Sequence, residues 1–314
     1  MRTLVVGAGV IGSVYAGKLL EAGHEVVLLA RGRRLLDLQV HGLVLEDAGS
    51  GRRTEVVVPS LSELVADDRY DLVVVAVRSE QLAGTVPVLL AMSDDSDVLF
   101  FGNTVGRQAE LVAALGGRAL FGFPAAGGVR DGPVVRYVMI RQQKTMLGEA
   151  TRTTTPRVRQ LQEVLVGAGF PTRTSADIDG WMIGHTAFVV PIGYALYRVG
   201  TDAARLAADP ETMGLMVRAT REAFRLLVAS GNAEIPANLR MLYLHMPTAF
   251  IVRYWRRVFA GPRGELWSRR IAAPPPKRCR LWPTSSRQPS VALVSQLRTS
   301  TTSFPLSCPH RSSP

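Results

Sequence analysis

Short apolar runs alternate with segments of helical periodicity through the first half of the chain. Helices are expected at Val10–Leu20, ended by Gly23, and near Gln108–Leu115. The predicted buried strands lie at residues 3–6, 24–30, 71–77, 98–102 and 119–124. Continuous apolar strands that alternate with helices are typical of a parallel sheet covered on both faces.

Smaller strand-like segments accompany this alternation. LVLED (43–47) and TEVVVP (54–59) alternate apolar and polar residues and predict a small antiparallel addition. SLSEL (60–64) predicts the start of a helix, while VVRYVMI (134–140) and KTMLGE (144–149) predict a closing hairpin.

The pattern changes in the second half of the chain. From about Asp177 to Phe259 it is almost entirely helical, which places a domain boundary near residues 165–175. We therefore expect an α/β fold, with a Rossmann-type, doubly wound parallel sheet in residues 1–170. An all-helical second domain is expected to follow in residues 171–267.

Residues 268–314 have a different composition again. They hold eight of the chain's 19 prolines and eight basic residues but no acidic residue, so most of the net charge of +11 belongs to them. Neither helical nor strand periodicity persists, which predicts disorder. Two explanations stay open: out-of-frame translation of a GC-rich gene, or a genuine basic tail that binds nucleic acid.

The composition before this tail limits the kinds of site that the chain can hold. Both cysteines, Cys279 and Cys308, lie in the tail, which excludes a disulfide framework or a thiolate metal site elsewhere and favours a reduced, cytoplasmic setting. The histidines lack metal-ligand spacing, so no metal is expected. TAFVVPIGYALY (186–197) is too short to span a bilayer and contains a proline, so no membrane segment is expected either.

A glycine-rich loop follows the first predicted strand. Gly7, Gly9 and Gly12 form a GxGxxG pattern, with Ala8, Val10 and Ile11 between them. The first glycine permits a tight turn, the second lets the backbone approach a pyrophosphate, and the third lets the helix pack close to the strand. Because the helix N-terminus presents free amides to phosphates, the loop predicts a dinucleotide site.

The second predicted strand ends in Arg31, where dinucleotide-binding folds usually carry an acidic residue that holds a ribose. A guanidinium offers a planar set of donors suited to a 2′-phosphate and can stack on adenine. NADP(H) is therefore the predicted cofactor, and a solvated loop arginine is the alternative. Arg33 and Arg34 are expected to face the solvent, although one of them could assist Arg31.

Three motifs together resemble the ketopantoate reductase family, the 2-dehydropantoate 2-reductases. They are GAGVIGSVYAGKLLEAGHEVVLLARG (7–32), DLVVVAVRSEQL (71–82) and FFGNTVG (100–106). The resemblance covers roughly residues 1–267. It implies a Rossmann domain followed by a helical domain, with the active site in the cleft between them. It also implies NADPH-dependent reduction of a 2-oxo acid to a 2-hydroxy acid.

The resemblance also assigns roles to single residues. Asn103 matches an asparagine near nicotinamide and substrate, and Arg78 falls where the family commonly has a lysine that faces the cofactor. Gly148 and Glu149 match a structural Gly-Glu pair.

One family residue has no match in this chain. The family's proton donor is a lysine two residues after a tryptophan, and Trp181 is followed at that spacing by Ile183. No lysine lies between residues 145 and 276, so the donor is absent whatever the alignment. His185 and, more distantly, Lys144 are the candidates to replace it.

Three functions from different classes follow. The first is an NADPH-dependent oxidoreductase that reduces a 2-oxo acid or related carbonyl, with ketopantoate itself disfavoured by Ile183. The second is a non-catalytic NADPH-binding protein or pseudoenzyme. The third is a nucleic-acid-binding protein that uses the basic tail. The expected partner is a small-molecule substrate rather than nucleic acid or a membrane, and a homodimer stays open.

Overall fold

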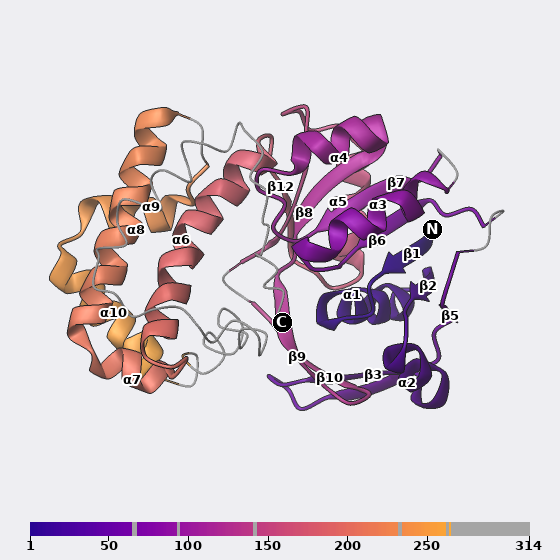
Figure 1. The fold of residues 1–314 in the computed structure, drawn as a ribbon, viewed down its shortest axis with the longest axis horizontal. Helices are drawn as coiled ribbons and strands as arrows, with labels where there is room; N and C mark the ends of the chain where they lie inside the picture. The colour runs from indigo at the N-terminus through magenta and orange to yellow at the C-terminus, as the bar shows by residue number, and fades with distance from the viewer. Residues whose placement is uncertain (65–67, 93–94, 141–142, 232–233, 262–263, 265–314) are drawn as a thin grey trace, which may run out of the picture. The chain divides into compact units, whose positions relative to one another are not determined.

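In a computed structural model, which describes residues 1–64, 68–92, 95–140, 143–231, 234–261 and 264, the predicted strands lie side by side in one main sheet (Figure 1). In spatial order the strands are β12 (Thr172–Thr174), β11 (Thr145–Glu149), β8 (Ala119–Phe123), β7 (Asp97–Phe101), β6 (Leu72–Val75), β1 (Arg2–Val6), β2 (Glu25–Leu29) and β5 (Ser60–Leu61). β11 runs antiparallel to β8, and the other pairings are parallel. From β5 to β8 this is the strand order of the Rossmann fold, as predicted.

A second, four-stranded sheet differs from the sequence prediction. Its order is β4 (Arg53–Val56), β3 (Leu43–Asp47), β10 (Val134–Met139) and β9 (Ala126–Asp131). The β3–β4 hairpin confirms the predicted antiparallel addition. The predicted closing hairpin is wrong, because β10 pairs with β9 and with the distant β3, while β11 enters the main sheet. Periodicity identifies a strand but not its partner.

Alternate residues of the central strands enter two separate cores. On β1, Val5 packs into one core while Leu4 and Val6 pack into the other. The first core includes α1 (Val10–Glu21), α5 (Pro156–Gly167) and the second sheet. The second includes α3 (Leu82–Leu90) and α4 (Gln108–Leu115). The sheet is thus covered on both faces, as the continuous apolar strands predict.

Two elements, near residues 60 and 35, differ from the sequence prediction. Residues 60–64 do not begin a helix, because Ser60–Leu61 forms the edge strand β5. Helix α2 (Arg33–His41) was not predicted; the sequence prediction for Arg33 and Arg34 at its start was only that they face the solvent. Two short 3₁₀ turns, η1 (Ser79–Gln81) and η2 (Gly116–Arg118), complete this half of the chain.

The second half is helical, as predicted. Its helices are α6 (Ile178–Arg198), α7 (Ala203–Ala208), α8 (Pro210–Ser230), α9 (Ala237–His245) and α10 (Thr248–Phe259). Asp177 caps α6 by accepting a hydrogen bond from the Gly180 amide at 3.0 Å. A third core packs α6 to α10 together around Phe224 and Tyr243. Because β12 still belongs to the main sheet, the purely helical part of the described residues begins after Thr174. The boundary between residues 170 and 171 stays a prediction.

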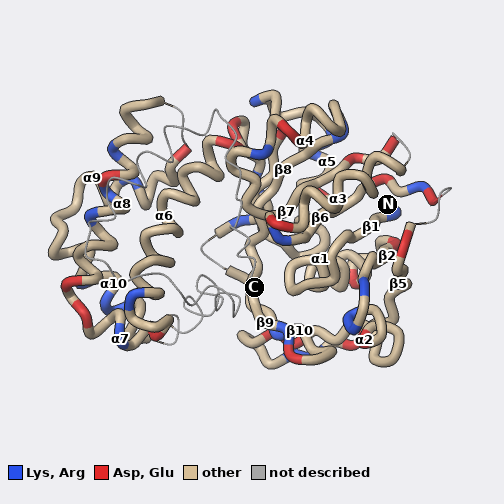
Figure 2. The backbone as a smooth tube through the Cα atoms, in the orientation of Figure 1, with Lys and Arg blue, Asp and Glu red and all other residues tan. Residues whose placement is uncertain are grey.

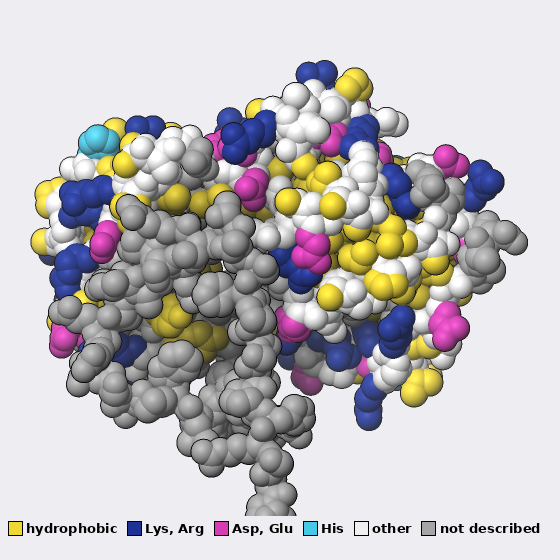
Figure 3. All heavy atoms as spheres, turned by 45° about the horizontal axis from the view of Figure 1, so that its top comes forward, with side chains coloured by type: hydrophobic (Ala, Val, Ile, Leu, Met, Phe, Trp, Pro, Cys, Tyr) yellow, Lys and Arg dark blue, Asp and Glu magenta, His cyan; other side chains and the backbone are white. Residues whose placement is uncertain are grey.

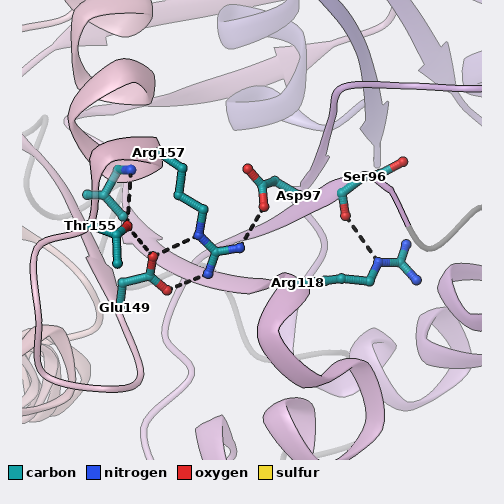
Figure 4. Close-up of polar contacts among 7 residues, drawn as sticks. Ser96, Asp97, Arg118, Glu149, Thr155 and Arg157 are labelled. Atoms are coloured by element: carbon teal, nitrogen blue, oxygen red, sulfur yellow. Dashed lines mark hydrogen bonds and ion pairs between the residues drawn. The ribbon is translucent and has the colours of Figure 1, made fainter.

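An ion-pair network around the buried Glu149 joins β11, α5 and β7 (Figure 4). Glu149 at the end of β11 is 4% exposed, and Arg157 of α5 donates two hydrogen bonds to it, at 2.8 and 2.5 Å. Arg157 also donates to Asp97 at the start of β7, at 2.7 Å. Thr155 donates a further bond to Glu149. The structural role expected for Glu149 fits this geometry.

Charges of both signs are interspersed over the described residues. Basic and acidic positions lie next to each other along α2, β9 and β10 in Figure 2, and both signs appear on the face shown in Figure 3. Within the described ranges, no helix is long and apolar enough to cross a membrane. The predicted tail, residues 268–314, lies outside the described residues.

Candidate cofactor-binding site

A cavity of about 1380 Å³ lies at the carboxyl ends of β1, β6 and β7. In parallel α/β sheets this edge is where ligands bind. The predicted residues that line the cavity are Gly7, Ala8, Gly9, Val10, Ile11, Arg31, Arg78 and Asn103. Segments up to about a hundred residues apart in the sequence therefore meet at one surface, as the motifs predicted.

The three glycines of the loop differ in conformation and in the space around them. Gly7 has a φ of +102°, and a Cβ there would lie 2.8 Å from the Ala76 carbonyl oxygen. A Cβ on Gly12 would lie 2.0 Å from the Gly7 carbonyl oxygen, so Gly12 permits the close packing of α1 on the loop. A Cβ on Gly9 would have no atom within 4 Å. Gly9 therefore leaves open space above the N-terminus of α1, as a pyrophosphate requires.

The basic cluster after β2 divides into exposed and buried residues. Arg31 is exposed and lines the cavity, and Arg33 is exposed as predicted. Arg34 is only 8% exposed, so its predicted solvent-facing position is wrong. Helix α2 begins at Arg33, which turns the Arg34 side chain inward against the glycine loop. Burial lowers the pKa of Arg34 to about 10, so the guanidinium remains charged at neutral pH.

Two further arginines border the cavity. Arg78 lies just after β6, is exposed, and is 3.9 Å from the Glu80 carboxylate. Arg130 on β9 was not predicted from the sequence; it forms an ion pair with Asp37 at 3.3 Å. No sequence signal identified Arg130, because β9 reaches the cavity only through the second sheet.

Asn103 connects the cavity wall to the helical half of the chain. It follows β7, and its side-chain oxygen accepts a hydrogen bond from the Val105 amide at 3.2 Å. Its side-chain nitrogen donates to the hydroxyl of Thr186 on α6, also at 3.2 Å. The neighbouring Thr104 hydroxyl contacts the sulfur of Met182 at 3.2 Å. Thr186 is thus a polar neighbour of the site that sequence reasoning missed.

The matching family model is described as ketopantoate reductase PanE/ApbA and covers residues 3–152, which include the glycine loop, Arg31, Arg78 and Asn103. Residues 3–152 belong to the ketopantoate reductase family.

Individual relatives agree with this assignment. A 2-dehydropantoate 2-reductase from Pyrococcus horikoshii is 27% identical over 199 residues, which are 62% of this chain and 64% of that protein. The match therefore spans less than two thirds of that relative.

Solved structures show the same fold over a longer part of the chain. A PanE/ApbA family ketopantoate reductase from Ralstonia eutropha JMP134 is 22% identical, with a TM-score of 0.64, over 84% of this chain and 82% of that one. D-mandelate dehydrogenase, solved with NADH and anilino(oxo)acetate, is 17% identical, with a TM-score of 0.65, over 83% and 80%.

Ile183, which the resemblance assigns to the family's lysine position, lies in an apolar environment. Ile183 is half-buried on α6 and packs against the core of the helical half. Lys144 is exposed and precedes β11. Within the described residues, no group of three or more metal-ligating side chains is close enough to hold a metal ion.

His185, the candidate replacement in this ketopantoate reductase-like chain, lies among aromatic rings. Its ring stacks on Trp181 with centroids 5.2 Å apart and lies 4.3 Å from the Phe123 ring. Phe123 is one of the described residues that line the cavity, and His185 is not. Burial lowers the pKa of His185 to about 4, so the imidazole is neutral at neutral pH.

Proposed function

We propose that the chain binds NADP(H) and reduces a 2-oxo acid or a related carbonyl compound to the hydroxy compound. One observation carries the proposal: a single cavity wall contains the glycine loop, Arg31 and Asn103. The name of the Pyrococcus relative supports a 2-oxo acid as the class of substrate.

The fit of a dinucleotide rests on the loop. Gly9 leaves open space where any side chain would stand between the backbone and a phosphate. Gly9 precedes α1, which has no side-chain cap, so the first amides of the helix are available to an anion. The NADH in the structure of D-mandelate dehydrogenase, which shares the fold, supports a nicotinamide dinucleotide as the ligand.

The choice of NADP(H) over NAD(H) rests on Arg31. The residue is exposed at the end of β2 and lines the cavity, as a contact to a 2′-phosphate requires. Asp37, the acid on α2, forms an ion pair with Arg130 at 3.3 Å, so its carboxylate is not an unpaired acceptor for the hydroxyls of a ribose. A guanidinium at the end of β2 favours a phosphate over a hydroxyl there.

The reduction needs a hydride, which NADPH supplies when bound, and a proton donor beside the carbonyl oxygen. Asn103 lies in the cavity wall, where its amide can place the substrate. A neutral imidazole can donate a hydrogen bond through its protonated ring nitrogen. We propose that His185 donates such a hydrogen bond to the carbonyl oxygen, while a water molecule supplies the proton that the resulting alkoxide takes up. This role requires a rearrangement of the cavity wall, because Phe123, 4.3 Å from the His185 ring, lines the cavity and His185 does not.

Ile183 favours a second function, the binding of NADP(H) without turnover. Its side chain is apolar and half-buried, and the resemblance assigns the family's proton donor to this position. The two functions share the cofactor site and differ only in catalysis.

The test begins with titration of the full chain with NADPH and NADH, followed by the rate of NADPH oxidation with ketopantoate and a panel of other 2-oxo acids. Arg31→Ala should raise the dissociation constant of NADPH at least tenfold and leave that of NADH within about twofold, since it removes a charged contact to the 2′-phosphate. Arg33→Ala is the matched control and should change neither affinity, because Arg33 is exposed but, unlike Arg31, does not line the cavity.

Each outcome separates the alternatives. Turnover with any 2-oxo acid supports the reductase, and tight NADPH binding without turnover on the whole panel supports the binding protein. Equal losses of NADPH and NADH affinity in Arg31→Ala would remove the selectivity role of Arg31. The absence of any nicotinamide dinucleotide binding by the unaltered chain would overturn both functions.

A further inference from the structure

Arg34 makes a set of buried contacts that the proposed cofactor role of the cluster does not explain. Its Nε donates to the Ala8 carbonyl oxygen at 3.0 Å, and its Nη2 donates to the Ser13 hydroxyl at 3.0 Å. Its Nη1 donates to the Pro133 carbonyl oxygen at 3.0 Å. One side chain on α2 therefore joins the glycine loop, α1 and the turn between β9 and β10.

The contacts converge on one peptide group of the glycine loop. The Ala8 carbonyl accepts hydrogen bonds from both Arg34 and the Ser13 hydroxyl, the latter at 3.2 Å. Because Ser13 also accepts a bond from Arg34, the three groups form a closed network. Ser13 is fully buried and Ala8 is 6% exposed, so water competes little for these bonds.

The orientation of this carbonyl determines the direction of the next amide. In a trans peptide the C=O of one residue and the N–H of the next point in opposite directions. The Ala8–Gly9 peptide is trans, so holding the Ala8 carbonyl toward Arg34 and Ser13 turns the Gly9 N–H away from them. Gly9 lines the cavity, where it has open space above it.

We infer that Arg34 and Ser13 are positioning residues that hold the Gly9 N–H toward the pyrophosphate of the bound dinucleotide. The inference rests on the proposed function and deepens it, because it assigns the two residues to pyrophosphate binding rather than to selection of the 2′-phosphate. A glycine peptide is conformationally free, since neither side-chain bulk nor a cap restrains it. The two side-chain donors supply the restraint that the glycine lacks, so the amide is oriented before the ligand arrives.

The experiment compares ligands with and without a pyrophosphate. NADPH and NADH both contain the pyrophosphate, whereas adenosine 2′-monophosphate retains the 2′-phosphate alone. Dissociation constants for all three are measured by calorimetry on the full chain and on Ser13→Ala and Arg34→Lys. Ser13→Ala removes one donor to Ala8 without changing charge, and Arg34→Lys keeps the charge but loses the three-point contact. Thermal unfolding without ligand shows that each variant is folded at the titration temperature.

Both variants should raise the dissociation constants of NADPH and NADH by the same factor, about tenfold or more. The dissociation constant of adenosine 2′-monophosphate should stay within about twofold. An equal loss for all three ligands would mean that the variants disturb the site as a whole, and a larger loss for NADPH than for NADH would mean that Arg34 acts on the 2′-phosphate. Either result would overturn the inference. Unchanged affinities would overturn it as well. Failure of the unaltered chain to bind any of the three would instead refute the proposed function.

Discussion

His185 should make the folded chain sensitive to mild acid. Its imidazole packs against Trp181 and Phe123, and burial lowers its pKa from 6.5 to about 4. The unfolded chain therefore binds a proton between pH 6.5 and pH 4 that the folded chain does not bind. Stability from this group is present above pH 6.5 and is lost as the pH falls toward 4, because protons then favour the unfolded state.

The size of the effect follows from the two pKa values. A difference of about 2.5 pKa units corresponds to about 3.4 kcal/mol once the pH is below both values. Between pH 7 and pH 5 the same difference gives a loss of about 2 kcal/mol. Because the His185 side chain is half-buried rather than sealed from solvent, this figure is an upper value.

The assay is urea denaturation of the unaltered chain and of His185→Gln at pH 7 and pH 5. The unaltered chain should lose more free energy of unfolding over this interval than His185→Gln, by up to about 2 kcal/mol. His41→Gln, at an exposed position, is the matched control and should keep the pH dependence of the unaltered chain. If His185→Gln and the unaltered chain lose the same stability, the imidazole is not held neutral by burial. The reasoning that limits it to hydrogen-bond donation would then be wrong.

Other predictions concern the ion pair and the glycine loop. Arg157→Ala should lower the free energy of unfolding by about 3 kcal/mol, because it leaves the buried Glu149 carboxylate without its cation; the exposed Arg159→Ala on the same helix should change it by less than about 0.5 kcal/mol in the same urea assay. Gly12→Ala should lower the thermal midpoint by several degrees, since its Cβ would meet the Gly7 carbonyl oxygen. Gly9→Ala should keep the midpoint of the unaltered chain but lose NADPH binding by titration, because its Cβ enters only the cavity; a lowered midpoint would contradict this.

The sequence predicted the elements that depend on local periodicity. The apolar run at residues 71–77 contains β6, and the segment near Gln108–Leu115 is α4. Both signals are contained within a single element, so no knowledge of distant neighbours is needed. The glycine loop could be placed for the same reason, since strand, turn and helix follow one another directly.

The parts that were not predicted depend on long-range neighbours. The sequence of β10 is typical of a strand, but its partner β3 lies about ninety residues earlier. Arg34 lies in an arginine-rich segment that is typical of solvent-exposed residues. Its burial depends on distant acceptors, the Ala8 and Pro133 carbonyls and the Ser13 hydroxyl, which no local pattern places beside it. The Thr186 contact with Asn103 likewise joins segments that no local pattern relates.

The pairing of β3 with β10 also bears on the order of folding. Strands this far apart can pair only after a long loop has closed, so the second sheet is expected to form late and to open early. Its strand β9 carries Gly128, Val129 and Arg130, which form part of the cavity wall. A ligand in the cavity would therefore slow the opening of this sheet. Amide hydrogen exchange in β9 and β10 would then report occupancy of the cavity, even if no reaction followed.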